Sequence, residues 1–435
     1  MAVTKPLPLS STSHPCESGE KLSELGGLQE HFWLAEHTGS HLAILVAEVE
    51  GSTTVNDWRD SLASLQVKYP ALAARLRKHP GERPYLESFP EVVIDFEVFS
   101  YEVHPDLDSI LSDRIVPSFE FGDGGLARIA LYHGPARSIV VMAAHHAASD
   151  GRTLVMMMRD LVAGASGNDI GLPLRALPPL TELLGMPSPE PYTNLLTLEE
   201  TALRSEPERP AVKVTHHKLG ADEFSVLLSR CKAESTTVQG ALVAAFILAG
   251  RELSEFWRSR PVVCLSPIDY RSLLGVEGSA GVPIGVHPTV STPEETKKGI
   301  RFWDLARATK SDMLKSQTKQ GAVAGVDYAA RFVLREGNPY DVRTVDPEHL
   351  LHHDLMVSNY GNYGHDMQFG SLMVRALYPA VTFPMKETQS ISLLTLDGVL
   401  HITHSSRMRL TGLWDHAREL LIAASTETVF KNRRN

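Results

Sequence analysis

Cysteine is scarce in this chain. Cys16, Cys231 and Cys264 are the only three cysteines among 435 residues, and they lie far apart. Their odd number and wide spacing exclude a disulfide framework, and the absence of a CxxC pair excludes the common zinc and redox motifs. We therefore expect the protein to work in a reducing compartment, with the cytoplasm as the default.

Long apolar segments and an excess of positive charge are also absent. The longest apolar helical run, residues 241–249, is too short to cross a bilayer, and the polar start of the chain has no signal-peptide core. Acidic residues outnumber basic ones by 52 to 42, which gives a net charge of −10. Binding to nucleic acid depends on a basic surface. We expect a soluble monomer with no membrane span and no nucleic-acid partner.

One stretch, residues 138–158, combines several structural signals. It begins with an apolar run rich in β-branched residues, which predicts a buried strand. His145 and His146 follow, then a turn of small residues, and then Asp150-Gly151. Apolar residues recur at helical spacing after this point. The pattern therefore predicts a buried strand, a tight turn and the start of a helix, with two imidazoles where the strand ends.

The two histidines cannot share one role. Neighbouring side chains on a strand point in opposite directions, so a cavity at this strand end receives one imidazole and the other is packed elsewhere. A purely structural interpretation also exists, because Asp150 alone is a typical helix N-cap and a histidine at a strand end is commonly a packed residue.

Residues 145–151, His-His-Ala-Ala-Ser-Asp-Gly, resemble the HHxxxDG motif of the condensation-domain and acyltransferase superfamily. This superfamily includes chloramphenicol acetyltransferase, plant BAHD acyltransferases, polyketide-associated acyltransferases and peptide-synthetase condensation domains. Weaker similarities follow the same order along the chain, at residues 27–33, 69–77, 268–271 and 356–361. The resemblance implies a layered α/β fold in which two chloramphenicol-acetyltransferase-like lobes form a pseudo-dimer around a central tunnel.

The distribution of proline suggests where the lobes divide. Prolines cluster in residues 167–210, and this density disfavours both helices and central strands. We therefore predict a flexible lead at residues 1–26, an N-terminal lobe at 27–166 that carries the motif, a crossover linker at 167–210 and a C-terminal lobe at 211–435.

Several further elements have clear local signals. Periodicity predicts an amphipathic helix at residues 53–68, a buried helix at 236–249 and a final helix at 413–428. Residues 390–395 and 399–404 read as strands joined by Asp397-Gly398, a strong hairpin signal.

The resemblance assigns roles to the motif residues. It implies that His146 is the general base and that His145 is structural, while Gly151 belongs to the turn. It also implies that Asp150 points away from the imidazole and pairs with an arginine, for which Arg271 is the first candidate and Arg75 the second. Imidazole chemistry independently suits the base, because a pKa near 6.5 allows a proton to be taken and returned near neutral pH.

Ser358 and Asn359 are candidates for binding the substrate or stabilising an oxyanion, because they match the family segment vSNxG. The alternative is that they only form a turn before Gly361. Plant BAHD enzymes carry a DFGWG segment, whereas residues 358–363 here read Ser-Asn-Tyr-Gly-Asn-Tyr. This difference favours the stand-alone microbial alcohol-acyltransferase or condensation-like branch.

We expect neither a metal nor a bound cofactor. Adjacent histidines occur at residues 216–217 and 352–353, but neighbours on a strand diverge and no HExxH or HxH spacing occurs. The implied co-substrate is an acyl-CoA or acyl-carrier-protein thioester.

Three functions remain open from the sequence. The first is an O-acyltransferase that acts on a small-molecule acceptor of secondary metabolism, at a hydroxyl more readily than at an amine. The second is an amide-forming condensation enzyme that works between carrier proteins. The third is an inactive relic that only binds a carrier. The intact motif weighs against the third, and the absence of a fused carrier or adenylation domain favours the first.

Overall fold

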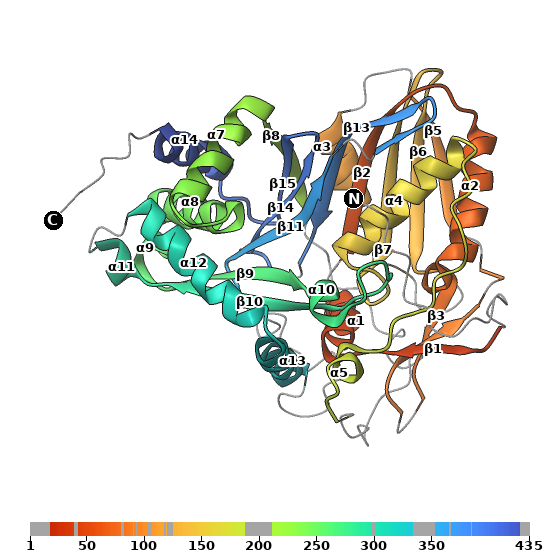
Figure 1. Cartoon of the computed structure of the whole chain (residues 1–435), viewed down its shortest axis with the longest axis horizontal. Coiled ribbons are helices and arrows are strands. Elements are labelled where there is room, and N and C mark those ends of the chain that lie inside the picture. Colours follow the sequence, from red (N-terminus) through yellow and green to blue (C-terminus); the bar gives the residue numbers. More distant parts are fainter. Residues whose placement is uncertain are drawn as a thin grey trace.

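The structure is a computed structural model that describes residues 18–38, 42–79, 82–89, 91–92, 94–101, 106–116, 119, 125–187, 211–297, 301–333, 353–364, 367–383 and 385–426. In this part of the chain, two six-stranded sheets stand beside each other and a three-stranded sheet lies at one end (Figure 1). Helices cover the outer faces. The predicted α/β class and its two lobes are therefore confirmed.

The first large sheet has the strand order β12-β13-β2-β7-β6-β5. Its members from the first half of the chain are β2 (Leu42–Glu50), β7 (Arg137–His145), β6 (Ala127–His133) and, at the edge, β5 (Asp95–Ser100). Alternate residues of β2 face opposite layers, as the strand period requires. One face packs against α2 (Val55–Lys68) and α4 (Gly151–Ala165), and the other packs against α3 (Leu107–Arg114).

A strand from the second half of the chain completes this sheet. β13 (Leu372–Val381) pairs antiparallel with β2, with Ala380 opposite Ile44, and short β12 (Gln368–Phe369) extends the edge. The first sheet therefore contains strands from both sides of the predicted linker. The boundaries drawn at residues 26, 166 and 210 stay predictions, because residues 1–17 and 188–210 lie outside the described part of the chain.

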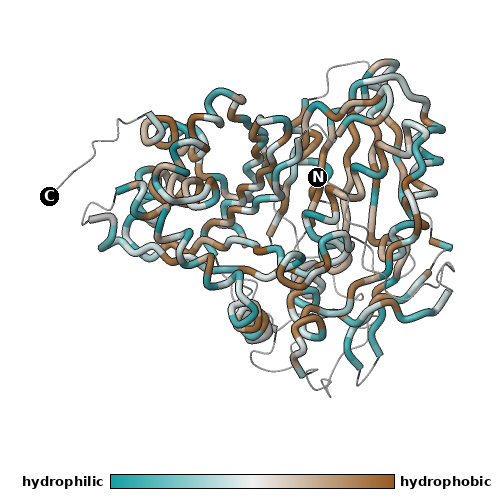
Figure 2. Tube along the Cα trace, viewed as in Figure 1, coloured by the Kyte–Doolittle hydropathy of each residue, from teal (hydrophilic) through white to brown (hydrophobic). Residues whose placement is uncertain are grey.

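The second large sheet has the order β10-β9-β11-β14-β15-β8. It contains β10 (Ile284–Ser291), β9 (Val262–Asp269), β11 (Leu355–Tyr363), β14 (Gln389–Leu396), β15 (Val399–Ser406) and β8 (Lys213–Leu219). One face packs under α7 (Ala221–Ala233), α8 (Val238–Leu253), α12 (Phe302–Ser316) and α14 (Leu413–Thr426). The apolar colouring of Figure 2 is concentrated in the sheets and in the helix faces against them.

The two large sheets meet where β15 passes β13. Thr403 and Ser405 donate side-chain hydrogen bonds to the carbonyls of Pro379 and Val381, the second at 2.5 Å. The side chain of Arg407 continues this contact by donating to the carbonyl of Phe383 at 3.1 Å. These bonds connect the two sheets through residues of β13 and β15 and of the chain just after each strand.

The remaining elements are a small sheet and the helices not named so far. The three-stranded sheet contains β1 (Lys21–Glu24), β4 (Tyr85–Ser88) and β3 (Ala74–Arg77). The other helices are α1 (Gly27–Thr38), η1 (Pro70–Ala73), α5 (Leu180–Leu183), α9 (Glu255–Ser259), α10 (Arg271–Leu274), α11 (Pro293–Lys297) and α13 (Lys319–Val333).

The elements with strong local signals are where the sequence predicts them. The helix predicted at 53–68 is α2, which begins at Val55, and the helix predicted at 236–249 is α8, which begins at Val238 and continues to Leu253. β14 and β15 form the predicted hairpin, in which Asp397 and Gly398 have φ angles of 48° and 79°, the left-handed pair that a type I′ turn needs. The final helix begins at Leu413 and is described to Thr426.

No single helix in the described residues combines the length and the apolar character needed to cross a membrane. α7 and α8 reach that length only together, and the chain bends by 102° between them.

Candidate active site

A cleft between the two lobes contains the motif histidine. Its walls come from α1, the turn after β7 and the start of α4 on one side, and from β9, β10, β11 and the end of β13 on the other. The cleft encloses about 1010 Å³ of space not filled by atoms, part of it open to solvent. His146 therefore lines a partly open hollow whose walls come from both lobes.

His146 is held by its own turn. Its Nδ1 lies 2.9 Å from the carbonyl oxygen of Ser149. A carbonyl only accepts, so Nδ1 carries the hydrogen in the neutral ring and Nε2 keeps the lone pair. The ring also stacks on Phe32, with centroids 3.9 Å apart and planes inclined by 9°. The geometry therefore fixes both the tautomer and the plane of the imidazole.

Helix α1 is fastened to the same turn. Gln29 donates from Nε2 to the carbonyl of Ala147 at 2.7 Å, and Glu30 forms a buried ion pair with Arg83. These contacts hold the helix that carries Phe32 against His146. The opening helix is thus part of the site.

Burial lowers the pKa of His146 below its ordinary value, because the protonated ring loses solvation. The Asp150 carboxylate and the Ser149 carbonyl act in the opposite direction and favour the protonated ring. The side chain is only 9% exposed. Near neutral pH the ring is therefore unprotonated and able to accept a proton.

His145 lies on the other side of the strand end, as the alternation of strand residues predicts. It is completely buried, its Nδ1 accepts a hydrogen bond from the Ala147 backbone at 3.0 Å, and its ring meets the edge of Phe119. It does not line the cleft. The structure thus separates the two histidines into one cleft residue and one packed residue.

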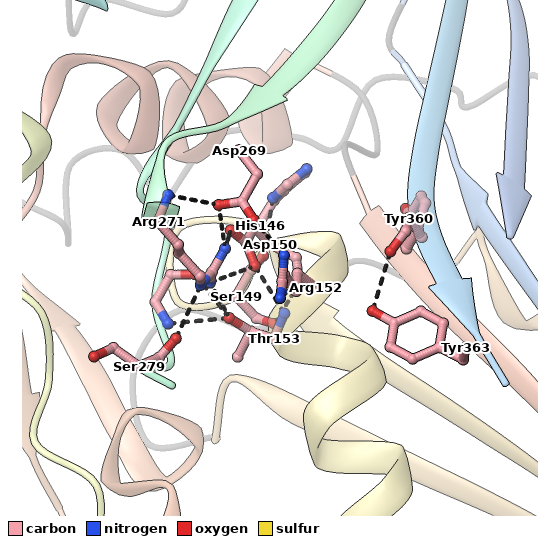
Figure 3. A network of polar contacts seen from close by, with 11 residues as sticks. His146, Ser149, Asp150, Arg152, Thr153, Asp269, Arg271, Ser279, Tyr360 and Tyr363 are labelled. Atoms are coloured by element: carbon pink, nitrogen blue, oxygen red, sulfur yellow. Dashed lines mark hydrogen bonds and ion pairs between the residues drawn. The ribbon is translucent and has the colours of Figure 1, made fainter. Parts of the chain in front are cut away.

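Asp150 has two structural partners (Figure 3). Its Oδ1 accepts from the Thr153 backbone at 2.8 Å and so caps α4. Both carboxylate oxygens also bind the Arg271 guanidinium, at 2.7 and 2.9 Å. Asp150 is 1% exposed and Arg271 is 0% exposed, so the pair joins the two lobes without solvent. Arg75, the second candidate, lies instead over the ring of Phe89.

The Arg271 guanidinium is surrounded by acceptors. Besides Asp150, it donates to Asp269 Oδ1 at 2.9 Å, to Thr153 Oγ1 at 2.9 Å and to the carbonyl of Ser279 at 3.0 Å. Burial opposes its charge, but the two carboxylates raise its pKa above the ordinary value. A buried ion pair with these extra hydrogen bonds avoids the cost of an isolated charge.

The charges continue outward from this pair. Asp269 binds Arg271 through Oδ1 and the half-exposed Arg152 through Oδ2, at 3.0 Å. Arg152 follows Gly151 in α4 and lines the cleft. Asp150, Arg271, Asp269 and Arg152 thus alternate in sign from the buried turn to the solvent, and each charge has an opposite neighbour.

Position 151 has no room for a side chain. A Cβ at this position would lie 2.3 Å from Cε1 of Tyr360, on β11 of the opposite lobe. The glycine therefore allows the N-terminus of α4 to approach β11 closely. The Tyr363 hydroxyl donates to the Tyr360 carbonyl at 3.1 Å and braces this part of the strand.

Ser358 and Asn359 both line the cleft on β11. Ser358 is buried, while Asn359 is exposed and its Oδ1 accepts from the Gly361 backbone at 3.0 Å. Gly361 has a φ of 112° at an irregularity in the pairing of β11 with β14. Asn359 therefore both stabilises the turn before Gly361, through its side-chain oxygen, and lines the cleft. Its side-chain nitrogen is a donor that a substrate could use.

Two further imidazoles that the sequence did not single out for this site line the same cleft. His31 lies on α1, and His353 lies just before β11. His353 drew attention only as part of an adjacent pair weighed for metal binding. Their place in the cleft follows from the packing of α1 against the second lobe, which no local spacing reveals.

No cluster of three or more metal-binding side chains occurs in the part of the chain that the structure describes. His216 binds Asp108 at 2.6 Å, whereas His217 stacks on Trp414. Adjacent histidines of β8 therefore have different neighbours, as the strand geometry predicts. His352 lies outside the described residues.

No family model and no curated protein matches this sequence. Solved structures do match. Polyketide synthase associated protein 5 from Mycobacterium tuberculosis has a TM-score of 0.64 at 16% identity, over 95% of this chain and 100% of that one. The epimerization domain of the third module of tyrocidine synthetase B has a TM-score of 0.64 at 17% identity, over 96% and 98%.

A third structure is the trichothecene 15-O-acetyltransferase from Fusarium sporotrichioides, with a TM-score of 0.63 at 12% identity, over 92% of this chain and 95% of that one. All three are matched along almost their full length. The chain has the two-lobed fold that condensation domains share with coenzyme A-dependent acyltransferases.

Proposed function

We propose that this protein is an acyltransferase that moves an acyl group from a coenzyme A or carrier-protein thioester to a hydroxyl of a small molecule. The observation that carries the proposal is His146, whose Nδ1 is bound to the carbonyl of Ser149 and whose ring lines the cleft between the lobes. A Fusarium protein of the same fold was solved with coenzyme A, with a TM-score of 0.58, which supports this type of donor.

The reaction needs one base and no acyl-enzyme. Nε2 of His146 takes the proton from the acceptor hydroxyl as its oxygen forms a bond to the thioester carbonyl carbon. The resulting oxyanion then collapses and breaks the carbon–sulfur bond. The thiolate receives the proton from His146 and leaves as a thiol, which restores the neutral imidazole.

Other cleft residues have supporting roles in this proposal. Ser358 and Asn359 donate to the oxyanion, and removal of such a donor typically costs about 2.7–4 kcal/mol of transition-state stabilisation. Asp150 and Arg271 hold the turn and touch neither substrate. The two substrates reach His146 from opposite mouths of a passage between the lobes.

The proposal is tested with purified protein, a panel of acyl-CoA donors and a panel of apolar alcohols, with ester products identified by mass spectrometry. We expect His146→Ala to reduce kcat by roughly 10²–10⁴-fold with an unchanged melting temperature. His416→Ala is the control, because this half-exposed histidine of α14 pairs with Glu252 and does not line the cleft.

Two results would overturn the proposal. One is undiminished ester formation by His146→Ala, and the other is the absence of ester from every thioester donor. A parallel reaction with a holo-carrier protein and amines separates the condensation alternative, because product formed only as amide from the carrier would select that reaction.

A further inference from the structure

Two buried histidines give the cleft a second polar feature, apart from the catalytic turn. His31 and His353 are each 2% exposed and line the cleft that holds His146. The three imidazoles come from different segments: α1, the turn after β7, and the chain two residues before β11. Such convergence requires both lobes, so these side chains belong to the assembled cleft and to neither lobe alone.

The surroundings of this pair are apolar. Leu265, Met356 and Phe383 belong to the hydrophobic cluster beneath this part of the cleft. The ring of His353 meets Phe383 edge to face, with centroids 4.7 Å apart, and its carbonyl accepts from Thr388 Oγ1 at 2.8 Å. The His353 ring is therefore held by packing, and its backbone is anchored.

The His31 ring is uncharged. Burial and the neighbouring His353 and His146 lower the pKa of His31 to about 3, so the ring stays neutral at cellular pH. A neutral imidazole offers one N–H donor and one nitrogen acceptor. These match a hydroxyl group, which also donates and accepts. They do not neutralise a carboxylate or an ammonium ion, whose burial beside apolar side chains is costly.

We propose that His31 and His353 form a recognition subsite for a second hydroxyl on an uncharged acceptor with an apolar body. The first hydroxyl is the one that reacts at His146, and the apolar wall takes the body of the molecule. The role of the subsite in acceptor recognition rests on the proposed function. Its preference for a diol can be measured by binding alone, without any acyl transfer.

The test measures binding without any thioester, using isothermal titration of the full chain with naphthyl ethanediol and with naphthyl ethanol. The two compounds share the apolar body and differ by one hydroxyl. We expect the wild type to bind the diol more tightly. His31→Phe and His353→Phe each weaken diol binding by about five- to tenfold, the typical worth of one neutral hydrogen bond, and leave binding of the mono-alcohol nearly unchanged.

Matched variants separate recognition from folding. His31→Gln and His353→Gln keep a donor and an acceptor and should retain part of the preference, while His416→Gln should retain all of it. An unchanged diol preference in both Phe variants overturns the proposal, as does equal weakening of both ligands or failure of the wild type to bind either ligand at millimolar concentration.

A failure of the subsite proposal can be told apart from a failure of the proposed function. A histidine-dependent diol preference without acyl transfer from any thioester preserves the subsite and rejects the enzyme. Ester formation that is indifferent to the second hydroxyl preserves the enzyme and rejects the subsite.

Discussion

At the scale of single residues, the neighbours of each imidazole determine its chemistry. His146 combines a hydrogen bond that fixes its tautomer with an aromatic ring that excludes water from one face. His145, next to it in sequence, accepts a backbone hydrogen bond away from the cleft. Two identical side chains thus have different surroundings because His145 is the last residue of a strand and His146 lies in the turn that follows.

Burial of His146 has a measurable effect on the pH dependence of the reaction. The unprotonated ring is the active form, so kcat/KM falls when pH drops through the pKa of His146. Because burial lowers this pKa, we expect the acidic limb of kcat/KM to lie below the ordinary histidine value of about 6.5. Initial rates measured across pH 4.5–8 with saturating thioester check this expectation.

A substitution tests whether desolvation is the cause. Phe32→Ala removes the stacked ring and admits water to His146, so the acidic limb should move upward toward about 6.5. A limb that stays in place, or that moves further down, would contradict the role given to Phe32.

The proposed base was accessible from sequence because its signal is local. The motif His-His-x-x-x-Asp-Gly places the strand end, the proposed base and the helix cap within seven adjacent positions. His31 and His353 carry no such local signal, because they are separated by more than three hundred residues and meet only through the packing of α1 against the second lobe. The motif resemblance left two candidate partners for Asp150, Arg271 first and Arg75 second. The structure pairs Asp150 with Arg271.

At the scale of elements, α4 depends on one aspartate for two purposes. Asp150 caps the helix and holds the buried Arg271. Asp106 provides a matched comparison, because it caps α3 through the Asp108 backbone but lies at the surface. The two caps differ mainly in the buried ion pair.

We expect Asp150→Ala to lower the free energy of unfolding by about 3–5 kcal/mol, because it removes the carboxylate that binds the buried Arg271 through both oxygens and leaves only Asp269 opposite that charge. Asp106→Ala should cost much less, because it removes only an exposed N-cap and no buried ion pair. Urea unfolding followed by circular dichroism measures both. Activity of Asp150→Ala should fall with the loosened turn, and a fully stable but inactive variant would show that Asp150 acts in the chemistry.

The predicted elements were the ones whose signals lie within a few residues. The apolar periodicity of residues 53–68 and the Asp397-Gly398 turn can each be read from adjacent residues alone. Both predictions are confirmed by the structure. β13 was not predicted as a member of the first sheet. Its partner β2 lies more than three hundred positions earlier, and Arg375 and Pro379 interrupt its apolar pattern.

At the scale of the whole molecule, buried neutral histidines link stability to pH. His404 is 1% exposed, donates to Gln389 Oε1 at 2.9 Å and has its pKa lowered to about 3 by burial and by nearby Arg409 and His217. His31 has a similarly low pKa. In the unfolded chain both protonate near pH 6.5.

Between pH 6.5 and about 3 the unfolded chain therefore binds more protons than the folded one, so stability declines as the pH falls through this window. We expect each of these histidines to contribute a loss of roughly 1–2 kcal/mol by pH 5. Unfolding free energies at pH 7.5 and pH 5 measure the total. His404→Gln keeps a donor for Gln389 and should reduce the difference, and an identical difference in this variant would contradict the assignment.

The place of β13 beside β2 also sets an order of events during synthesis. β2 leaves the ribosome early, yet the strand that covers one of its edges is made only when residue 381 has been added. Until then the nascent first sheet presents an uncovered row of backbone donors and acceptors, which other chains can pair with. The first sheet is therefore completed only after most of the second lobe has been synthesised, up to the end of β13.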